Sequence, residues 1–239
     1  MRALLLTFLA ACGSASADRP GGNGAPVVVE LFTSQGCSSC PPADALLSSF
    51  ARTGSVRGRA VVPLAFHVDY WNQLGWADPY SSPAWTARQQ SYSHWLGDRS
   101  VYTPELVVAG GAGMVGSEAG RIADAIAAAP VQRELAATAT WSPRSLVVDA
   151  TAPADAELWV AVWEDAPATA VPRGENAGAT LVTDRVVRAL AKVAAPGQAG
   201  RAVVALDLGW KPSGGVVFAQ RGDGHIVGAR VLPEAPTQR

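Results

Sequence analysis

The chain has 239 residues, of which 49% are hydrophobic and 16% are charged, and its formal net charge is −1. This balance excludes the strongly basic surface with which proteins bind nucleic acids, so we expect no nucleic-acid partner. Beyond the N-terminal segment no apolar stretch is long enough for a transmembrane helix, and the length suits a moderate domain followed by a smaller one.

The N-terminal residues predict export. Arg2 precedes an apolar run over residues 3–11 that is too short to span a bilayer. Two forms of processing stay open: a secretory signal peptide over residues 1–17, or a lipoprotein signal over residues 1–11 with a lipid on Cys12. Either one predicts a periplasmic or extracellular protein, whose contact with a membrane would be a lipid anchor alone.

A strand, a Cys-x-x-Cys pair and a helix follow a glycine-rich tether over residues 18–26. Residues 27–32 are apolar at nearly every position, as in a strand buried on both faces. Cys37 and Cys40 come after a short polar turn, and the two prolines behind them suit the first turn of a helix. Because unpaired N–H groups at a helix N-terminus stabilise a thiolate, this arrangement predicts a redox dithiol.

Other roles for the cysteine pair stay open. Zinc would need two more ligands, and the sequence has no second Cys-x-x-Cys and no His-x-x-x-His. Once Cys12 is lipidated or removed, Cys37 and Cys40 can pair only with each other, as a redox-active or a permanent structural disulfide. A loop this short gains little stability from closure, which favours redox chemistry.

A second buried strand is predicted over residues 60–68, parallel to the first because a helix connects them. It ends at the sheet edge that carries the dithiol, where open parallel sheets bind ligands. His67 and Asp69 alternate along this segment and should point to one face, with Asp69 the better candidate for proton transfer. A hydrogen-bonded core position explains His67 equally well.

The remaining elements divide the chain into two predicted domains. A helix from a Ser82 cap to Gly97, a strand over 105–109, a hairpin and a helix capped by Ser117 complete the first domain. The first domain spans residues 27–130, and the order of its strands and helices is that of an α/β thioredoxin-like fold with a helical insertion. The second domain, 141–234, is predicted to be a small antiparallel β domain with these strands: 145–150, 157–163, 180–190, 201–208, 216–220 and 225–232.

Several segments carry a family resemblance: Glu30–Asp44, His67–Trp71, Leu74–Trp76, Thr86–Gln89, Val101–Pro104 and Arg173–Gly178. They are similar to motifs of a bacterial family of secreted thioredoxin-like proteins that is catalogued only as a domain of unknown function. The resemblance covers nearly the whole mature chain. It implies a thioredoxin-like fold and no established substrate.

The resemblance also implies roles for individual residues. Pro104, after Thr103, corresponds to the cis-proline that faces the dithiol in thioredoxin-like proteins. Glu30 corresponds approximately to their buried acid and would share its proton-relay role; a solvated or paired residue at the sheet edge explains it equally well. Pro41 disfavours the α region at the preceding Cys40, which predicts a helix that begins only after the motif.

The sequence thus predicts a cell-envelope thiol–disulfide oxidoreductase without a cofactor. Cys37, expected to be the more exposed cysteine, would attack disulfides of proteins or small thiols, and Cys40 would resolve the mixed disulfide. Thr103 and Pro104 would align the substrate strand. Two alternatives remain: a Cu(I)-binding module with Cys37, Cys40 and His67 as ligands, and a binding protein whose disulfide is only structural.

Overall fold

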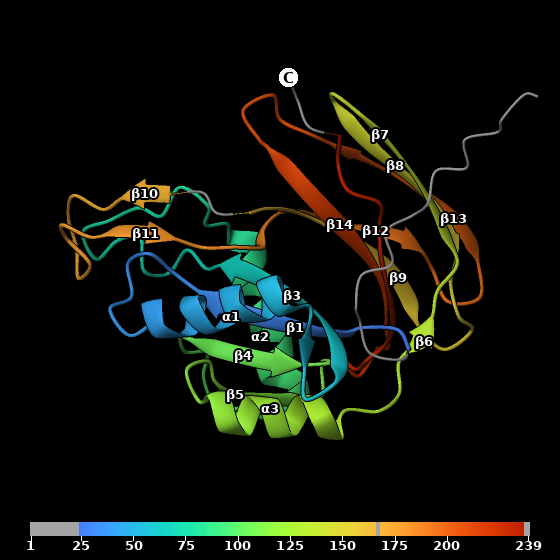
Figure 1. Ribbon diagram of the computed structural model, residues 1–239, viewed down its shortest axis with the longest axis horizontal. Helices are drawn as coiled ribbons and strands as arrows, with labels where there is room; N and C mark the ends of the chain where they lie inside the picture. Colours follow the sequence, from blue (N-terminus) through green and yellow to red (C-terminus); the bar gives the residue numbers. More distant parts are fainter. Residues whose placement is uncertain (1–23, 166–167, 237–239) are drawn as a thin grey trace, which may run out of the picture.

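The structure, a computed structural model, describes residues 24–165 and 168–236 (Figure 1). The predicted signal segment and Cys12 lie outside this range, as does most of the predicted tether. No helix in the described part of the chain is long and apolar enough to cross a membrane.

The protein has a mixed α/β fold in which strands predominate. The helices are α1 (Pro41–Thr53), α2 (Pro83–Leu96) and α3 (Ala119–Ala128). The largest sheet contains, in spatial order, β5 (Ala112–Val115), β4 (Glu105–Val108), β1 (Val27–Thr33), β3 (Arg59–His67), β12 (Val186–Ala194), β9 (Glu157–Glu164), β14 (Pro212–Gln220), β15 (Ile226–Val231) and β6 (Arg133–Glu134), with β2 (Ser55–Val56) beside β3. Two further sheets are β13 (Ala199–Ala205), β8 (Ser145–Thr151) and β7 (Ala137–Ser142), and the pair β10 (Ala168–Ala170) and β11 (Thr180–Val182).

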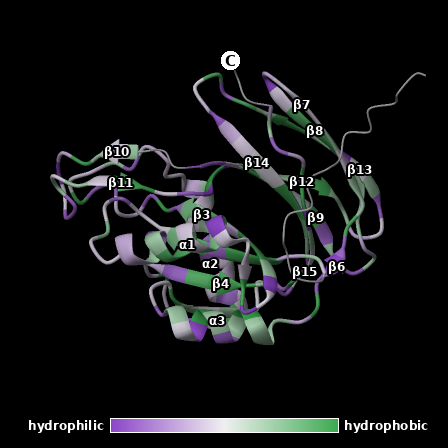
Figure 2. Ribbon diagram, viewed as in Figure 1, coloured by the Kyte–Doolittle hydropathy of each residue, from purple (hydrophilic) through white to green (hydrophobic). Residues whose placement is uncertain are grey.

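Helices cover both faces of the sheet around β1. This strand is buried along its whole length and pairs in parallel with β3, as its continuous apolar run predicts. Val27, Val29 and Leu31 pack with α1 and α3, whereas Val28 and Phe32 pack with α2 on the opposite face. The three helices therefore gather around β1, β3 and β4 in Figure 1, and hydrophobic residues run along these elements in Figure 2.

Both predicted domains contribute strands to the largest sheet. β12 pairs in parallel with β3 through Val186 and Ala65, and it pairs antiparallel with β9. Phe66 of β3 shares a buried cluster with Trp163 of β9 and Phe218 of β14. The strands after residue 141 thus continue the sheet that begins with β1 and bury the same core.

Local boundaries differ from the sequence-based expectation at a few points. The strand predicted over 180–190 is two strands, β11 and β12, because the chain turns before β12 and Arg185 has a positive φ of 60°. Ser82 and Gly97 bound α2 as predicted. Ser117 is not the cap of α3, since the N-cap position belongs to Glu118 and no side chain caps the helix.

Candidate functional site

Cys37 and Cys40 form a disulfide at the N-terminus of α1, with their Cα atoms 5.4 Å apart. The turn after β1 is closed by the Cys37 amide, which donates to Ser34 O at 3.1 Å. Cys40 occupies the N-cap of α1 with φ −78° and ψ −38°, so the expectation that it avoids the α region is wrong. Its carbonyl already accepts from the Ala43 and Asp44 amides, and these bonds outweigh the bias that Pro41 imposes.

Both cysteine side chains are 0% exposed, so the expectation that Cys37 is the more exposed cysteine is wrong.

A segment in the second half of the chain contacts the Cys-x-x-Cys motif. We call this segment, residues 173–178 between β10 and β11, the cap loop. Its Glu175 and Asn176 bond to the turn that carries Cys37, and no sequence pattern had assigned them a contact.

Thr103 and Pro104 lie at the same end of the sheet and are joined by the predicted cis peptide bond, which is confirmed. Trp71 Nε1 donates to Thr103 Oγ1 at 2.7 Å. The Trp71 side chain also packs on Gly36, the residue before Cys37, where an added Cβ would come within 3.1 Å of Trp71 Cβ. Trp71 therefore links the Thr103–Pro104 segment to the disulfide turn.

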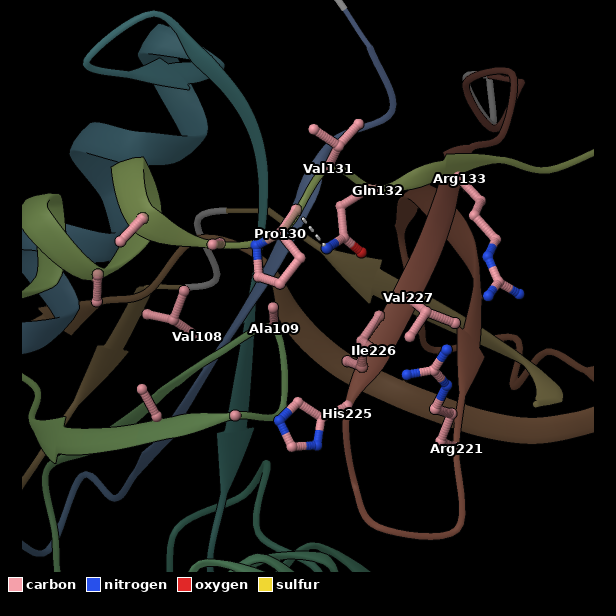
Figure 3. A pocket seen from close by; sticks show the side chains of 15 residues that line it. Val108, Ala109, Pro130, Val131, Gln132, Arg133, Arg221, His225, Ile226 and Val227 are labelled. Atoms are coloured by element: carbon pink, nitrogen blue, oxygen red, sulfur yellow. Dashed lines mark hydrogen bonds between the residues drawn. The ribbon is translucent and has the colours of Figure 1, made fainter. Parts of the chain in front are cut away.

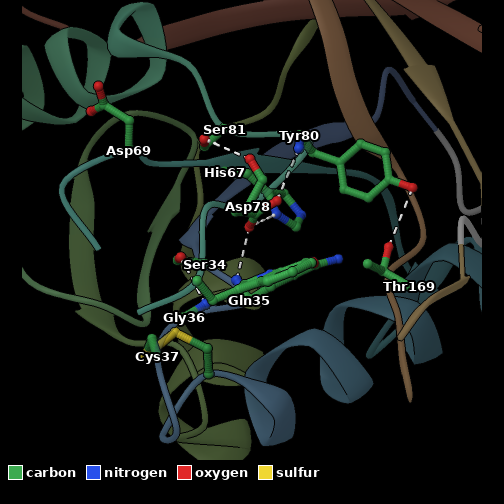
Figure 4. Close-up of polar contacts among 12 residues, drawn as sticks. Ser34, Gln35, Gly36, Cys37, His67, Asp69, Asp78, Tyr80, Ser81 and Thr169 are labelled. Atoms are coloured by element: carbon green, nitrogen blue, oxygen red, sulfur yellow. Dashed lines mark hydrogen bonds and ion pairs between the residues drawn. A yellow bond between two sulfur atoms is a disulfide. The ribbon is translucent and has the colours of Figure 1, made fainter. Parts of the chain in front are cut away.

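His67 belongs to a buried polar cluster next to this turn (Figure 4). Its Nδ1 lies 2.7 Å from Asp78 Oδ2, and both side chains are almost completely buried. The same Asp78 oxygen accepts the Gln35 amide at 2.8 Å, two residues before Cys37. Asp78 was not predicted, because it lies in a loop 43 residues from its partner Gln35.

A second carboxyl, Asp44 of α1, completes this acid–base cluster. Burial raises the pKa of Asp44 to about 7, and the charge of His67 opposes this shift only in part. Burial alone would lower the pKa of His67, but the charge and hydrogen bond of Asp78 outweigh it and raise that pKa. Among the described residues, Asp44 Oδ1 and His67 Nε2 are buried without a hydrogen-bond partner. Asp44 can therefore exchange a proton near neutral pH, one helical turn beyond Cys40.

Asp69 and Glu30 lie outside this cluster. β3 ends at His67, so the alternation that placed Asp69 on the same face does not continue, and its side chain points away from the disulfide in Figure 4. Asp69 Oδ1 instead accepts the Thr86 hydroxyl at 2.5 Å. Glu30 is paired with Arg88 and bonded to Tyr92 of α2. The expected pairing is therefore present, but a solvated or edge position is wrong, because Glu30 is fully buried in β1 between β3 and β4.

Within the described ranges, 24–165 and 168–236, no three His, Cys, Asp or Glu side chains form a group that could hold a metal ion. The alternative ligand set of Cys37, Cys40 and His67 is therefore not assembled in this disulfide-bonded state. A cavity of about 390 Å³ lies between α3 and β15 (Figure 3), and none of the predicted site residues lines it.

Residues 28–220 match the model of a family described as a protein of unknown function, DUF1223. Among solved structures, the crystal structure of protein AGR_C_4864 from Agrobacterium tumefaciens is 30% identical in sequence, with a TM-score of 0.70. That match covers 92% of this chain and 99% of the Agrobacterium chain. HBP35 of Porphyromonas gingivalis is 15% identical over 92% of this chain and 80% of its own, and with a TM-score of 0.57 it shares the fold alone. No curated protein matches the sequence.

Proposed function

We propose that this chain, which belongs to the DUF1223 family of proteins of unknown function, is a thiol–disulfide oxidoreductase of the cell envelope with a thioredoxin-like first half. The order strand, Cys-x-x-Cys, helix supports this proposal. So does the cis peptide bond before Pro104 at the same end of the sheet. The location rests on the N-terminal residues, and mass spectrometry of the mature protein distinguishes a lipid on Cys12 from an unmodified N-terminus at Asp18.

The reaction exchanges two electrons between the protein and a substrate dithiol. A substrate thiolate attacks Cys37 Sγ, the Cys37–Cys40 bond breaks, and Cys40 leaves as a thiolate that takes up a proton. A second substrate thiolate then attacks the mixed disulfide and releases Cys37, which is also protonated. The substrate loses two electrons and two protons to become a disulfide, and the protein becomes a dithiol. Reduction of a substrate disulfide follows the same steps in reverse.

The observation that carries the proposal is the buried acid–base cluster of Asp44, His67 and Asp78 beside the disulfide. A structural disulfide does not titrate and needs no proton donor behind it. A carboxyl with a pKa of about 7 is well matched to give a proton to the leaving Cys40 thiolate and to take it back. We therefore assign Asp44 as the candidate proton donor, with His67 and Asp78 as its charged partners.

Equilibration of the purified protein with glutathione or dithiothreitol buffers, followed by trapping of free thiols, tests the function. We expect reversible reduction at a potential above about −300 mV. With a disulfide such as oxidised glutathione, Cys40→Ser should accumulate a mixed disulfide on Cys37 and release one glutathione thiolate, whereas Cys37→Ser should not. A disulfide that stays intact below about −300 mV contradicts the proposal.

That outcome would favour the second candidate, a binding protein with an inert disulfide. The complete burial of both cysteines supports this candidate, because a buried disulfide is shielded from attacking thiolates. The phenotype of Cys37→Ser in cells separates the two functions, because an inert disulfide predicts that activity in the cell survives the substitution.

A further inference from the structure

The cap loop makes polar contacts with three residues of the disulfide turn: Gln35, Cys37 and Ser38. Glu175 Oε2 accepts the Ser38 amide at 2.9 Å and the Ser38 hydroxyl at 2.7 Å. Asn176 Nδ2 donates to Gln35 O and to Cys37 O, at 2.9 Å each. Ser38 is the first residue after Cys37, so these bonds fix the backbone on both sides of the reactive cysteine.

Close backbone contacts hold the cap loop against residues 74–76. Gly75 and Gly174 both have positive φ, and a Cβ on Gly75 would lie 3.3 Å from Gly174 Cα. Trp76 packs beside Gly174, and its Nε1 donates to Gln35 Oε1 at 3.2 Å. The cap loop is therefore held between residues 74–76 and the disulfide turn, which positions Glu175 accurately.

These contacts have a consequence for the reduced protein. A thiolate near a helix N-terminus is stabilised by nearby hydrogen-bond donors. Cys37 Sγ lies 3.3 Å from Ser39 Oγ, and the Ser38 amide is the N–H group that directly follows Cys37 in the chain. Glu175 takes both donors of Ser38, and these two bonds hold the pKa of the Glu175 carboxyl below its usual range. Glu175 is therefore ionised at neutral pH and adds a negative charge beside the site, although solvent screens that charge because the side chain is exposed.

We propose that Glu175 is a positioning residue that sets the reduction potential of the Cys37–Cys40 couple. By occupying the Ser38 donors it withholds them from the Cys37 thiolate, destabilises the reduced protein and makes the couple more strongly reducing. This inference rests on the proposed function, since it concerns the same dithiol. It assigns a redox role to a loop that lies 137 residues from the cysteine motif in sequence.

The test compares Glu175→Ala and Glu175→Gln with the wild type in glutathione buffers. Glu175→Ala should shift the equilibrium toward the dithiol by about tenfold, which corresponds to about 30 mV. The pKa of the Cys37 thiol, measured from the pH dependence of alkylation, should fall in the same variant. Glu175→Gln keeps an acceptor for Ser38 but loses the charge, so its equilibrium should lie between the other two.

Glu134→Gln is the matched control. Glu134 is exposed on β6, and its substitution removes one negative charge without changing a contact of the cap loop. It should behave as the wild type does. A Glu175→Ala variant with the equilibrium and thiol pKa of the wild type overturns the role of Glu175 alone. A wild-type disulfide that no buffer reduces overturns the proposed function, so the two failures are distinguishable.

Discussion

At the scale of single residues, Asp44 makes the stability of the oxidised protein depend on pH. Its folded pKa of about 7 lies above the ordinary aspartate value. A carboxyl whose pKa is raised by folding contributes stability below its unfolded pKa, and this stability is lost as the pH rises through the folded pKa. Wild-type protein should therefore lose stability between about pH 4 and pH 7, by an amount on the order of 4 kcal/mol at most.

Asp44→Asn should remove most of this loss. His67 also has a raised pKa, mainly because the charge and hydrogen bond of Asp78 outweigh its burial, and the charge of Asp44 adds to this shift. The difference between wild type and variant therefore measures the contribution of Asp44 together with its coupling to His67. Urea unfolding at pH 5 and pH 8 measures the effect, and equal pH dependence in the two proteins would contradict the assigned pKa.

The same substitution should slow the thiol exchange. If Asp44 protonates the leaving Cys40 thiolate, Asp44→Asn should lower the rate of reduction by dithiothreitol at pH 7 by about 100-fold. Asp124→Asn, an exposed aspartate of α3 paired with Arg57, is the control and should leave the rate unchanged. A rate for Asp44→Asn within a factor of two or three of the wild type would remove Asp44 from the reaction.

At the scale of elements, α2 is held by a buried ion pair in addition to the apolar packing of Trp85 and Tyr92. Only Trp85, Gln89 and Tyr92 of this helix are buried. Arg88 reaches Glu30 of β1 with Nε at 2.7 Å, and its Nη1 donates to Gln220 of β14 at 3.2 Å. One side chain thus joins the helix to two strands from opposite ends of the sequence.

Arg88→Met should destabilise the protein by about 3–5 kcal/mol, because it leaves the Glu30 carboxylate buried without its cation. Adding Glu30→Gln should recover much of the loss, since the uncompensated charge is then gone. Arg121→Met breaks an exposed pair with Glu118 and should cost less than about 1 kcal/mol. Urea unfolding of the four proteins measures these values, and a small loss in Arg88→Met would show that apolar packing holds α2.

The sequence predicted local elements well and long-range contacts poorly. The apolar run of β1, the proline start of α1 and the caps of α2 are local signals, and the structure contains these elements with nearly the predicted bounds. Asp44 was missed because an acid in the first turn of a helix is ordinarily explained by the helix dipole. Asp78 and Glu175 were missed because they contact the disulfide turn from loops that are distant in sequence.

At the scale of the whole molecule, the continuous sheet predicts that the two halves fold together. Without residues 141–239, β3 loses its neighbour β12, and the buried face around Phe66 loses Trp163 and Phe218. An isolated 27–130 fragment would expose an unpaired strand edge and an apolar surface, so it should aggregate or remain partly unfolded. Circular dichroism and urea unfolding test this, and a cooperative transition of the fragment would contradict it.

The long sequence separation of the cap loop also orders the steps by which the protein matures. The contact between Ser38 and Glu175 spans 137 residues, so the cysteine motif emerges well before its cover when the chain is made from its N-terminus. On the proposed function, Cys37 and Cys40 can be oxidised during that interval before the cap loop reaches them. The contacts of Glu175 and Asn176 with the disulfide turn can form only after residues 173–178 have been made, so they act on a motif that is already present.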